Sequence, residues 1–245
     1  MFPSSALAVA RAVVDPFLTV VFPSSCVVCR EALSSPSRGP LCAACWSRLP
    51  RHLDQLCACG LPVALGVPLP CGRCRRGLSP FEAGASLGPY EGGLRTVIHE
   101  LKYRGRRRLA ERLAEGLVAS AAVRRVLADG VVLAPVPLHP RRLRERGFNQ
   151  SDLLARAVAA RAGVLVASAL VRRKDTSSQS GLSAAERRRN VAGAFVVRRR
   201  SAVAGRVVVL VDDVLTTGAT VRACSAALRD AGASAVRVLT VARVA

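Results

Sequence analysis

The chain has 245 residues, of which 51% are hydrophobic, and this excludes wholesale disorder and allows one α/β domain of ordinary size plus a small module. Its formal net charge is +21, from 37 basic and 16 acidic residues. The most apolar N-terminal stretch, residues 6–22, is interrupted by Arg11, Asp15 and Pro16, which excludes a membrane span there and makes a poor signal peptide. We interpret it as a helical lead-in and expect a cytoplasmic protein.

Eight of the nine cysteines lie within residues 26–74 as four close pairs. In chain order they are Cys26-x-x-Cys29, Cys42-x-x-Cys45, Cys57-x-Cys59 and Cys71-x-x-Cys74. Two such pairs complete a Cys₄ site for structural Zn²⁺, which would stabilise a segment poor in large apolar residues. The spacing does not decide whether the cysteine pairs combine into zinc sites sequentially or in an interleaved order. It also leaves open whether a second zinc ion binds, because Cys57-x-Cys59 departs from the two-residue spacing. We expect residues 1–79 to form the lead-in helix and a zinc-ribbon module that is either single or double.

Residues 80–245 are predicted to alternate strands and helices. In chain order we expect a turn at 90–93, helices at 94–103 and 109–127, a strand at 131–136, a helix at 151–162, strands at 164–171 and 207–211, a helix carrying Val221, Cys224, Leu228 and Ala231, and a strand at 235–244. Such alternation predicts a parallel sheet with helices on both faces and a ligand crevice at the carboxyl ends of the strands.

The strand at 207–211 has no polar alternation, which indicates burial on both faces, and it ends in Asp212 and Asp213. A loop of small residues follows and opens the next helix; its members are Thr216, Thr217, Gly218, Ala219 and Thr220. Small residues let the backbone approach an anion, and the helix N-terminus points N–H groups at it. This layout predicts a phosphate-binding cradle beside two carboxylates.

Basic residues concentrate after the strand at 131–136, because residues 139–200 hold 15 basic and 4 acidic side chains. We expect a loop that carries Arg141, Arg144 and Arg146 and contacts pyrophosphate or a DNA backbone, although a generally solvated basic surface is the alternative. The polar segment 172–190 is expected to be a functional loop, with disorder as the alternative, and Ser183–Glu186 fits a capping box. The few candidates for base stacking are Phe148, Tyr103, Tyr90 and Trp46, and Phe148 could instead fill the core.

The acidic pair with Thr-Thr-Gly-Ala-Thr resembles the phosphoribosyl pyrophosphate (PRPP) loop of type I phosphoribosyltransferases. Over nearly its whole length the chain resembles the ComF competence proteins, a zinc ribbon joined to such a domain. The matching pieces are the cysteine pairs, the PRPP loop, residues 98–105, residues 135–139, the Arg-Gly-Phe-Asn-Gln run at 146–150, and Gln179, Leu182, Arg187 and Asn190. The resemblance implies that Asp212 and Asp213 bind the ribose hydroxyls as the catalytic pair and that residues 216–220 bind the 5′-phosphate.

The same resemblance implies a PRPP-binding protein that supports uptake or processing of single-stranded DNA in natural transformation. We assign Lys102, with Arg141, Arg144 and Arg146, to pyrophosphate or the DNA backbone. The expected cofactors are structural Zn²⁺ and Mg²⁺ with PRPP; the expected partners are PRPP or a nucleotide, single-stranded DNA and proteins of the DNA-uptake machinery. A phosphoribosyltransferase of nucleotide metabolism or salvage with no direct DNA role stays open as the alternative.

Overall fold

The computed structural model describes residues 24–35, 39–52, 55–64, 66–128, 130–174 and 193–244. The predicted lead-in helix at 6–22 lies outside these residues, as do most of the polar segment 172–190 and its capping box at Ser183–Glu186. Within the described part, every helix is too short or too polar to cross a bilayer.

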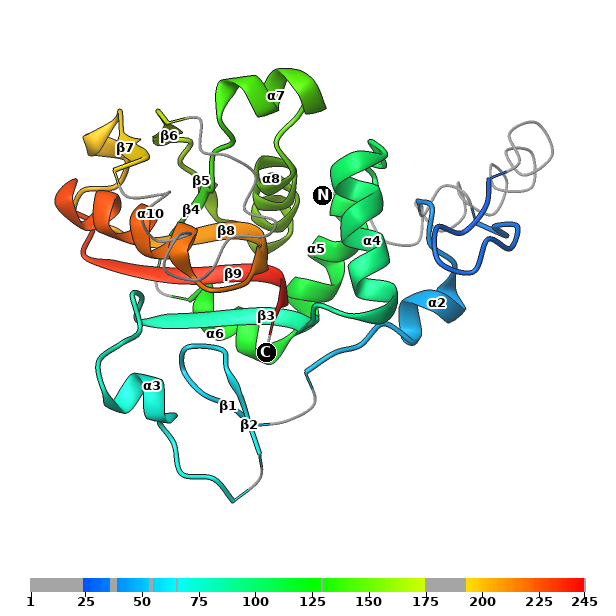
Figure 1. Cartoon of the computed structure of the whole chain (residues 1–245), viewed down its shortest axis with the longest axis horizontal. Coiled ribbons are helices and arrows are strands. Elements are labelled where there is room, and N and C mark those ends of the chain that lie inside the picture. The colour runs from blue at the N-terminus through cyan, green and yellow to red at the C-terminus, as the bar shows by residue number, and fades with distance from the viewer. Residues whose placement is uncertain are drawn as a thin grey trace.

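A five-stranded parallel sheet in the order β3-β9-β8-β4-β5 forms the centre of the larger domain (Figure 1). Its strands are β3 (Ala83–Pro89), β4 (Val132–Pro135), β5 (Leu165–Val166), β8 (Val207–Leu215) and β9 (Ala235–Arg243). The predicted α/β class is confirmed. Residues 208–211 of the central strand β8 are at most 1% exposed, since layers cover both faces.

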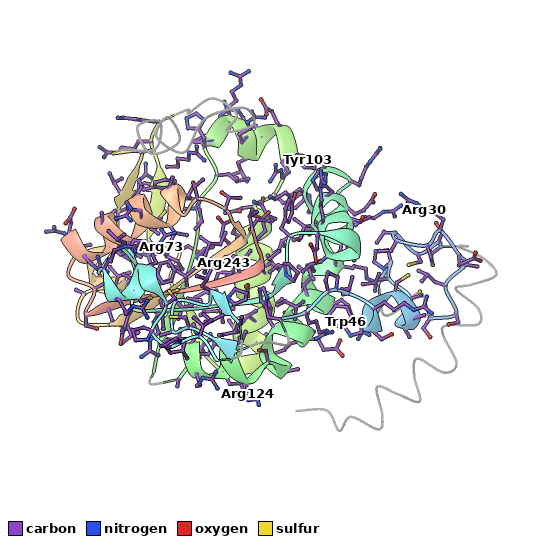
Figure 2. All side chains as sticks on the ribbon, turned by 60° about the horizontal axis from the view of Figure 1, so that its bottom comes forward. Arg30, Trp46, Arg73, Tyr103, Arg124 and Arg243 are labelled. Carbon is purple, nitrogen blue, oxygen red and sulfur yellow. The ribbon has the colours of Figure 1, made fainter. Side chains whose placement is uncertain are left out.

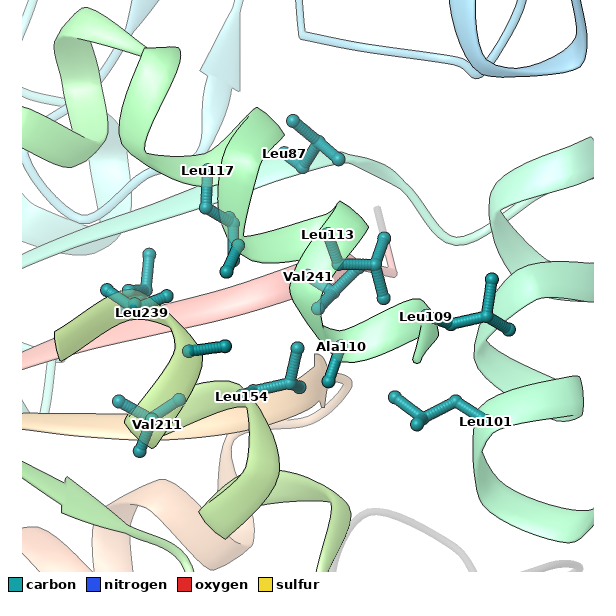
Figure 3. Packing of buried hydrophobic residues seen from close by; sticks show 14 of the residues in the cluster. Leu87, Leu101, Leu109, Ala110, Leu113, Leu117, Leu154, Val211, Leu239 and Val241 are labelled. Carbon is teal, nitrogen blue, oxygen red and sulfur yellow. The ribbon is translucent and has the colours of Figure 1, made fainter. Parts of the chain in front are cut away.

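Helices α4 (Gly92–Tyr103), α5 (Leu109–Ala119), α6 (Ala121–Val126) and α8 (Gln150–Ala162) pack on one face of the sheet. There Leu113 lies beside Val241, and Leu154 lies on the side of the cluster toward Val211 (Figure 3). Helix α10 (Ala219–Asp230) covers the other face, with the antiparallel pair β6 (Leu170–Arg172) and β7 (Phe195–Val197) beside it. The two layers leave the carboxyl edge of the sheet accessible.

The main differences from the sequence predictions lie at four places. The single helix expected at 109–127 is two helices, because Ser120 adopts an extended backbone between α5 and α6. The strand expected at 164–171 is also two: β5 joins the main sheet, whereas β6 leaves it to pair with β7. The arginine loop is helix α7 (Pro140–Arg146), which begins at a proline suited to the first helical turn and ends at Gly147 in the left-handed region, φ +74°. Strand β3 was missed, since its Gly, Ala and Ser are weak strand formers.

The two cysteine-rich segments pack against opposite layers. Cys26, Val27 and Leu41 join the cluster of α4 and α5, next to the short helix α2 (Ala43–Ser47). The second segment, with β1 (Gln55–Leu56), β2 (Pro62–Val63) and α3 (Gly72–Arg75), joins the cluster of α10.

The N-terminal part of the chain also forms backbone hydrogen bonds with the free edge of β3. The Gly84 N–H donates to the Ala58 carbonyl at 2.7 Å, and the His52 N–H donates to the Leu87 carbonyl at 3.2 Å. These bonds cover an edge that would otherwise be open to strand pairing. The domain boundary near residue 79 stays a prediction.

Candidate functional site

The acidic pair lies near the end of β8, which runs past its predicted end at Val211 to Leu215. Successive strand residues point to opposite faces, so the two carboxylates have different surroundings. Asp213 faces α4, where the Lys102 ammonium lies 2.6 Å from the Asp213 Oδ2. The Lys102 side chain is 18% exposed and the Asp213 side chain 5%. The Asp212 Oδ1 accepts from the Ser151 hydroxyl and from the Asp213 N–H, both at 2.9 Å.

Burial shifts the pKa values of Asp212 and Lys102. It raises the pKa of Asp212, while Lys102, Ser151 and Arg172 act in the opposite direction. Burial also lowers the pKa of Lys102 to about 8; the Asp212 charge opposes that shift and Arg146 adds to it. A lysine that titrates near neutral pH beside two carboxylates is a typical feature of a functional pocket.

The predicted phosphate cradle has the expected backbone. Gly218 is in the left-handed region, φ +75°, and begins α10 with no side-chain cap. The first N–H groups of a helix have no intrahelical acceptor, so Ala219 and Thr220 present donors at the positive end of a 12-residue helix. This helix end can hold a phosphate group.

Carboxylates, loop and basic side chains meet in one cavity of about 260 Å³. Of the predicted site residues, it is lined by Asp212, Asp213, Thr216, Thr217, Gly218, Ala219, Thr220, Lys102 and Arg146. Arg141 and Arg144 do not line it; both are exposed on α7, where Arg141 pairs with Glu145 at 3.0 Å. The pocket therefore gathers the acidic pair with two of the four predicted cations.

Three further polar residues of the cavity were not assigned a site role from the sequence: Gln150, Ser151 and Arg172. Ser151 lies in the first turn of α8 and its hydroxyl donates to Asp212, while Asn149 caps that helix by accepting from the Ser151 N–H at 3.0 Å. Gln150 lies in the Arg-Gly-Phe-Asn-Gln run, which was a usable signal. Arg172 is the first residue of the polar segment 172–190, which was predicted to be a functional loop, but its place in the pocket depends on the long-range pairing of β6 with β7.

The eight paired cysteines gather as two sequential quartets, Cys26, Cys29, Cys42, Cys45 and Cys57, Cys59, Cys71, Cys74, with all sulfurs of each quartet within 4.8 Å of one another. Tetrahedral Zn²⁺ with Zn–S bonds of about 2.3 Å places sulfurs about 3.8 Å apart. The separations are 3.9 Å for Cys29–Cys42, 3.6 Å for Cys57–Cys74 and 3.7 Å for Cys59–Cys71. Both quartets therefore fit structural zinc, including the one with the shorter Cys57-x-Cys59 spacing.

The thiols of the first quartet show why a cation would stabilise it. Burial acts to raise the pKa of Cys26, but backbone N–H groups, led by that of Cys42, outweigh it and lower the pKa to about 6. Burial and the neighbouring thiols raise the pKa of Cys45 to about 12. The negative charge of one thiolate thus disfavours ionisation of its neighbours, and a divalent cation would relieve that repulsion.

Comparison with known proteins matches both parts of the chain. Residues 17–78 match the double zinc ribbon domain, and residues 150–245 match the phosphoribosyl transferase domain. DNA utilization protein YhgH of Salmonella typhimurium is 38% identical over 228 residues, which cover 90% of this chain and 97% of that protein. The Escherichia coli K12 protein of the same name is 39% identical with the same coverage. Competence protein F of Haemophilus influenzae is 30% identical over 223 residues, 89% of this chain and 96% of its own.

Among solved structures, glutamine PRPP amidotransferase from B. subtilis aligns at 26% identity over 54% of this chain and 25% of its own, with a TM-score of 0.36, too loose a fit to bear on the site. The relatives above, in contrast, align over nearly their full lengths, and the alignments cover about nine tenths of this chain, which itself matches the double zinc ribbon and the phosphoribosyl transferase domain. On this basis the chain belongs to the ComF family, together with competence protein F and DNA utilization protein YhgH.

Proposed function

We propose that the chain binds PRPP, or a nucleotide with the same phosphoribosyl group, with Mg²⁺ in the cavity at the end of β8. One observation carries this: Asp212 and Asp213 share that cavity with the uncapped N-terminus of α10. A phosphoribosyl group needs hydroxyl acceptors beside a phosphate site, and the cavity offers both.

The charges of the cavity suit such a ligand. Lys102, Arg146 and Arg172 line it together with Asp212 and Asp213. The cations would hold the pyrophosphate, the amides of α10 the 5′-phosphate, and the carboxylates the ribose hydroxyls. Mg²⁺ would neutralise part of the pyrophosphate charge, and oxygen ligands of the kind that the two carboxylates offer suit it. Fixed carboxylates beside the ribose would also stabilise positive charge developing on it.

We further propose that this binding serves the uptake or processing of single-stranded DNA. The support comes from two relatives, whose names describe DNA utilization and competence. The strongly basic composition, +21 overall, suits a nucleic-acid partner.

The test is calorimetry with PRPP and Mg²⁺. We expect Asp212→Asn with Asp213→Asn to weaken binding at least tenfold, about 1.4 kcal/mol, because the amides carry no charge at nearly the same volume. Asp230→Asn with Glu82→Gln is the matched control, since it removes two exposed carboxylates outside the cavity and should leave affinity unchanged. Wild-type protein that gives neither heat nor a thermal shift at millimolar PRPP would refute the proposal.

A further inference from the structure

The four aromatic candidates for base stacking differ in how far the fold exposes their rings. Phe148 is 8% exposed in the core, with the Arg107 guanidinium 4.8 Å from its ring centroid. The Trp46 ring is covered by Arg112 at 4.5 Å and Arg51 at 4.9 Å. Tyr103, in contrast, is 65% exposed at the end of α4 (Figure 2). It presents a large aromatic surface to solvent.

Tyr103 belongs to a short row of rings along α4. His99 lies one helical turn before it, with ring centroids 5.4 Å apart, and Tyr90 follows at 6.4 Å from His99. The Tyr90 hydroxyl and the His99 Nε2 are 3.0 Å apart, which fixes the row. The Arg146 guanidinium lies 5.2 Å from the Tyr103 ring centroid. An aromatic row flanked by arginine is the kind of surface on which unpaired bases stack.

Tyr103 also stands between two larger cavities. A cavity of about 200 Å³ is lined by Tyr103 and Gly105 and shares Lys102 and Arg146 with the PRPP cavity. Gly105 in turn lines a third cavity of about 400 Å³ between the first cysteine segment and α5. The three cavities are therefore neighbours, with Lys102, Arg146 and Gly105 as the lining residues that they share.

The third cavity is basic. Its walls include three consecutive exposed arginines, Arg106, Arg107 and Arg108, and no acidic side chain among the described residues. The middle cavity contains Glu145, but that carboxylate is paired with Arg141 at 3.0 Å and with Arg142 at 3.2 Å. The side of Tyr103 that carries Arg106, Arg107 and Arg108 is thus strongly positive. On the other side three cations, Lys102, Arg146 and Arg172, face two carboxylates, Asp212 and Asp213.

We propose that single-stranded DNA binds along this groove, with a base stacked on Tyr103 and backbone phosphates on Arg106 and Arg108. The proposal rests on the proposed role in DNA handling and names the surface for it. A duplex keeps its base faces stacked inside and cannot use the ring, so the groove selects single strands. The strand leads past Arg146 to the PRPP cavity, which places its end beside the phosphoribosyl ligand.

The test is fluorescence anisotropy with a labelled oligothymidylate of about 12 nucleotides, titrated at several salt concentrations. We expect Tyr103→Ala to weaken binding about 5- to 150-fold at an unchanged salt slope, because one base loses its stacking partner. Tyr103→Phe keeps the ring and should bind like wild type. The ring is exposed, so neither change should alter the melting temperature.

Arg106→Ala with Arg108→Ala should flatten the log–log salt slope by about 1.4, since each phosphate on a single strand contributes about 0.7. Arg124→Ala with Arg125→Ala removes the same charge from α6, on the opposite side of Figure 2 from Tyr103, and should leave the slope unchanged. Equal slope changes for both pairs would mean diffuse attraction and would overturn the groove.

Three other results would overturn it: no binding by wild-type protein, unchanged binding by Tyr103→Ala, or equal competition by duplex DNA or thymidine monophosphate. Calorimetry with PRPP separates the two proposals. Wild-type protein that binds PRPP but not the oligonucleotide refutes the groove alone. Protein that binds the oligonucleotide through Tyr103 but not PRPP refutes the phosphoribosyl pocket alone.

Discussion

Lys102 should make PRPP binding depend on pH in a specific direction. Burial lowers its pKa to about 8, from an ordinary value of 10.5, so the folded protein releases this proton near pH 8 while the unfolded chain still holds it. The unfolded state then binds more protons between about pH 8 and 10.5, and through Lys102 the free energy of unfolding rises with pH across that window. A loss of PRPP affinity above pH 8 is therefore not caused by unfolding at this group.

The expected magnitude follows from the protonated fraction. With a pKa of about 8, about nine tenths of the Lys102 side chains are charged at pH 7 and about one tenth at pH 9. If only the ammonium binds pyrophosphate, affinity should fall about tenfold over those two pH units. The total loss of affinity cannot exceed what the Lys102 contact contributes, and a hydrogen bond to a charged group contributes about 1.5–3 kcal/mol, or about 10- to 150-fold in affinity.

The assay is calorimetry of Mg²⁺-PRPP binding at pH 7, 8 and 9. Lys102→Arg keeps the charge throughout this range and should give a flat profile, which also controls for any titration of the ligand. Lys102→Met removes the charge and should bind weakly at every pH. A flat wild-type profile, or the same decline in Lys102→Arg, would refute the assignment of Lys102 to the ligand.

Two further predictions concern the zinc clusters and the core. Metal analysis should find two zinc ions per chain, and Cys26→Ser should reduce that content and lower the melting temperature of the whole chain, because Cys26 is buried in the cluster of α4 and α5. Cys224 lies outside both quartets, so the Cys224→Ala variant should still bind both zinc ions. A zinc content near zero in wild-type protein, purified under reducing conditions without chelator, would contradict this prediction. Phe148→Ala should cost about 3–5 kcal/mol and lower the melting temperature by about 6–20 °C. Phe148→Leu should recover most of that loss, and an unchanged melting temperature for Phe148→Ala would show that the ring does not support the core.

The sequence alone was sufficient where the signal is local. The uninterrupted apolar run before Asp212, the small residues after it and the close cysteine pairs each restrict the backbone over a few positions. They predicted the central strand, the start of α10 and the ligand type of the metal clusters. The same local rules were wrong at Ser120 and at residues 164–171, because helical and strand periodicity continues across a break that packing imposes.

Tertiary structure alone decided which distant residues meet. The sequence left the pairing of the cysteines open, and folding brings them together as two sequential quartets that pack against opposite layers. It left Phe148 open as a stacking candidate or a core residue and named Tyr103 among the other candidates, and packing buries the first and exposes the second. Lys102 reaches Asp213 only because α4 crosses the end of β8. These outcomes depend on contacts between residues far apart in the chain, whose free energy no local pattern of side chains encodes.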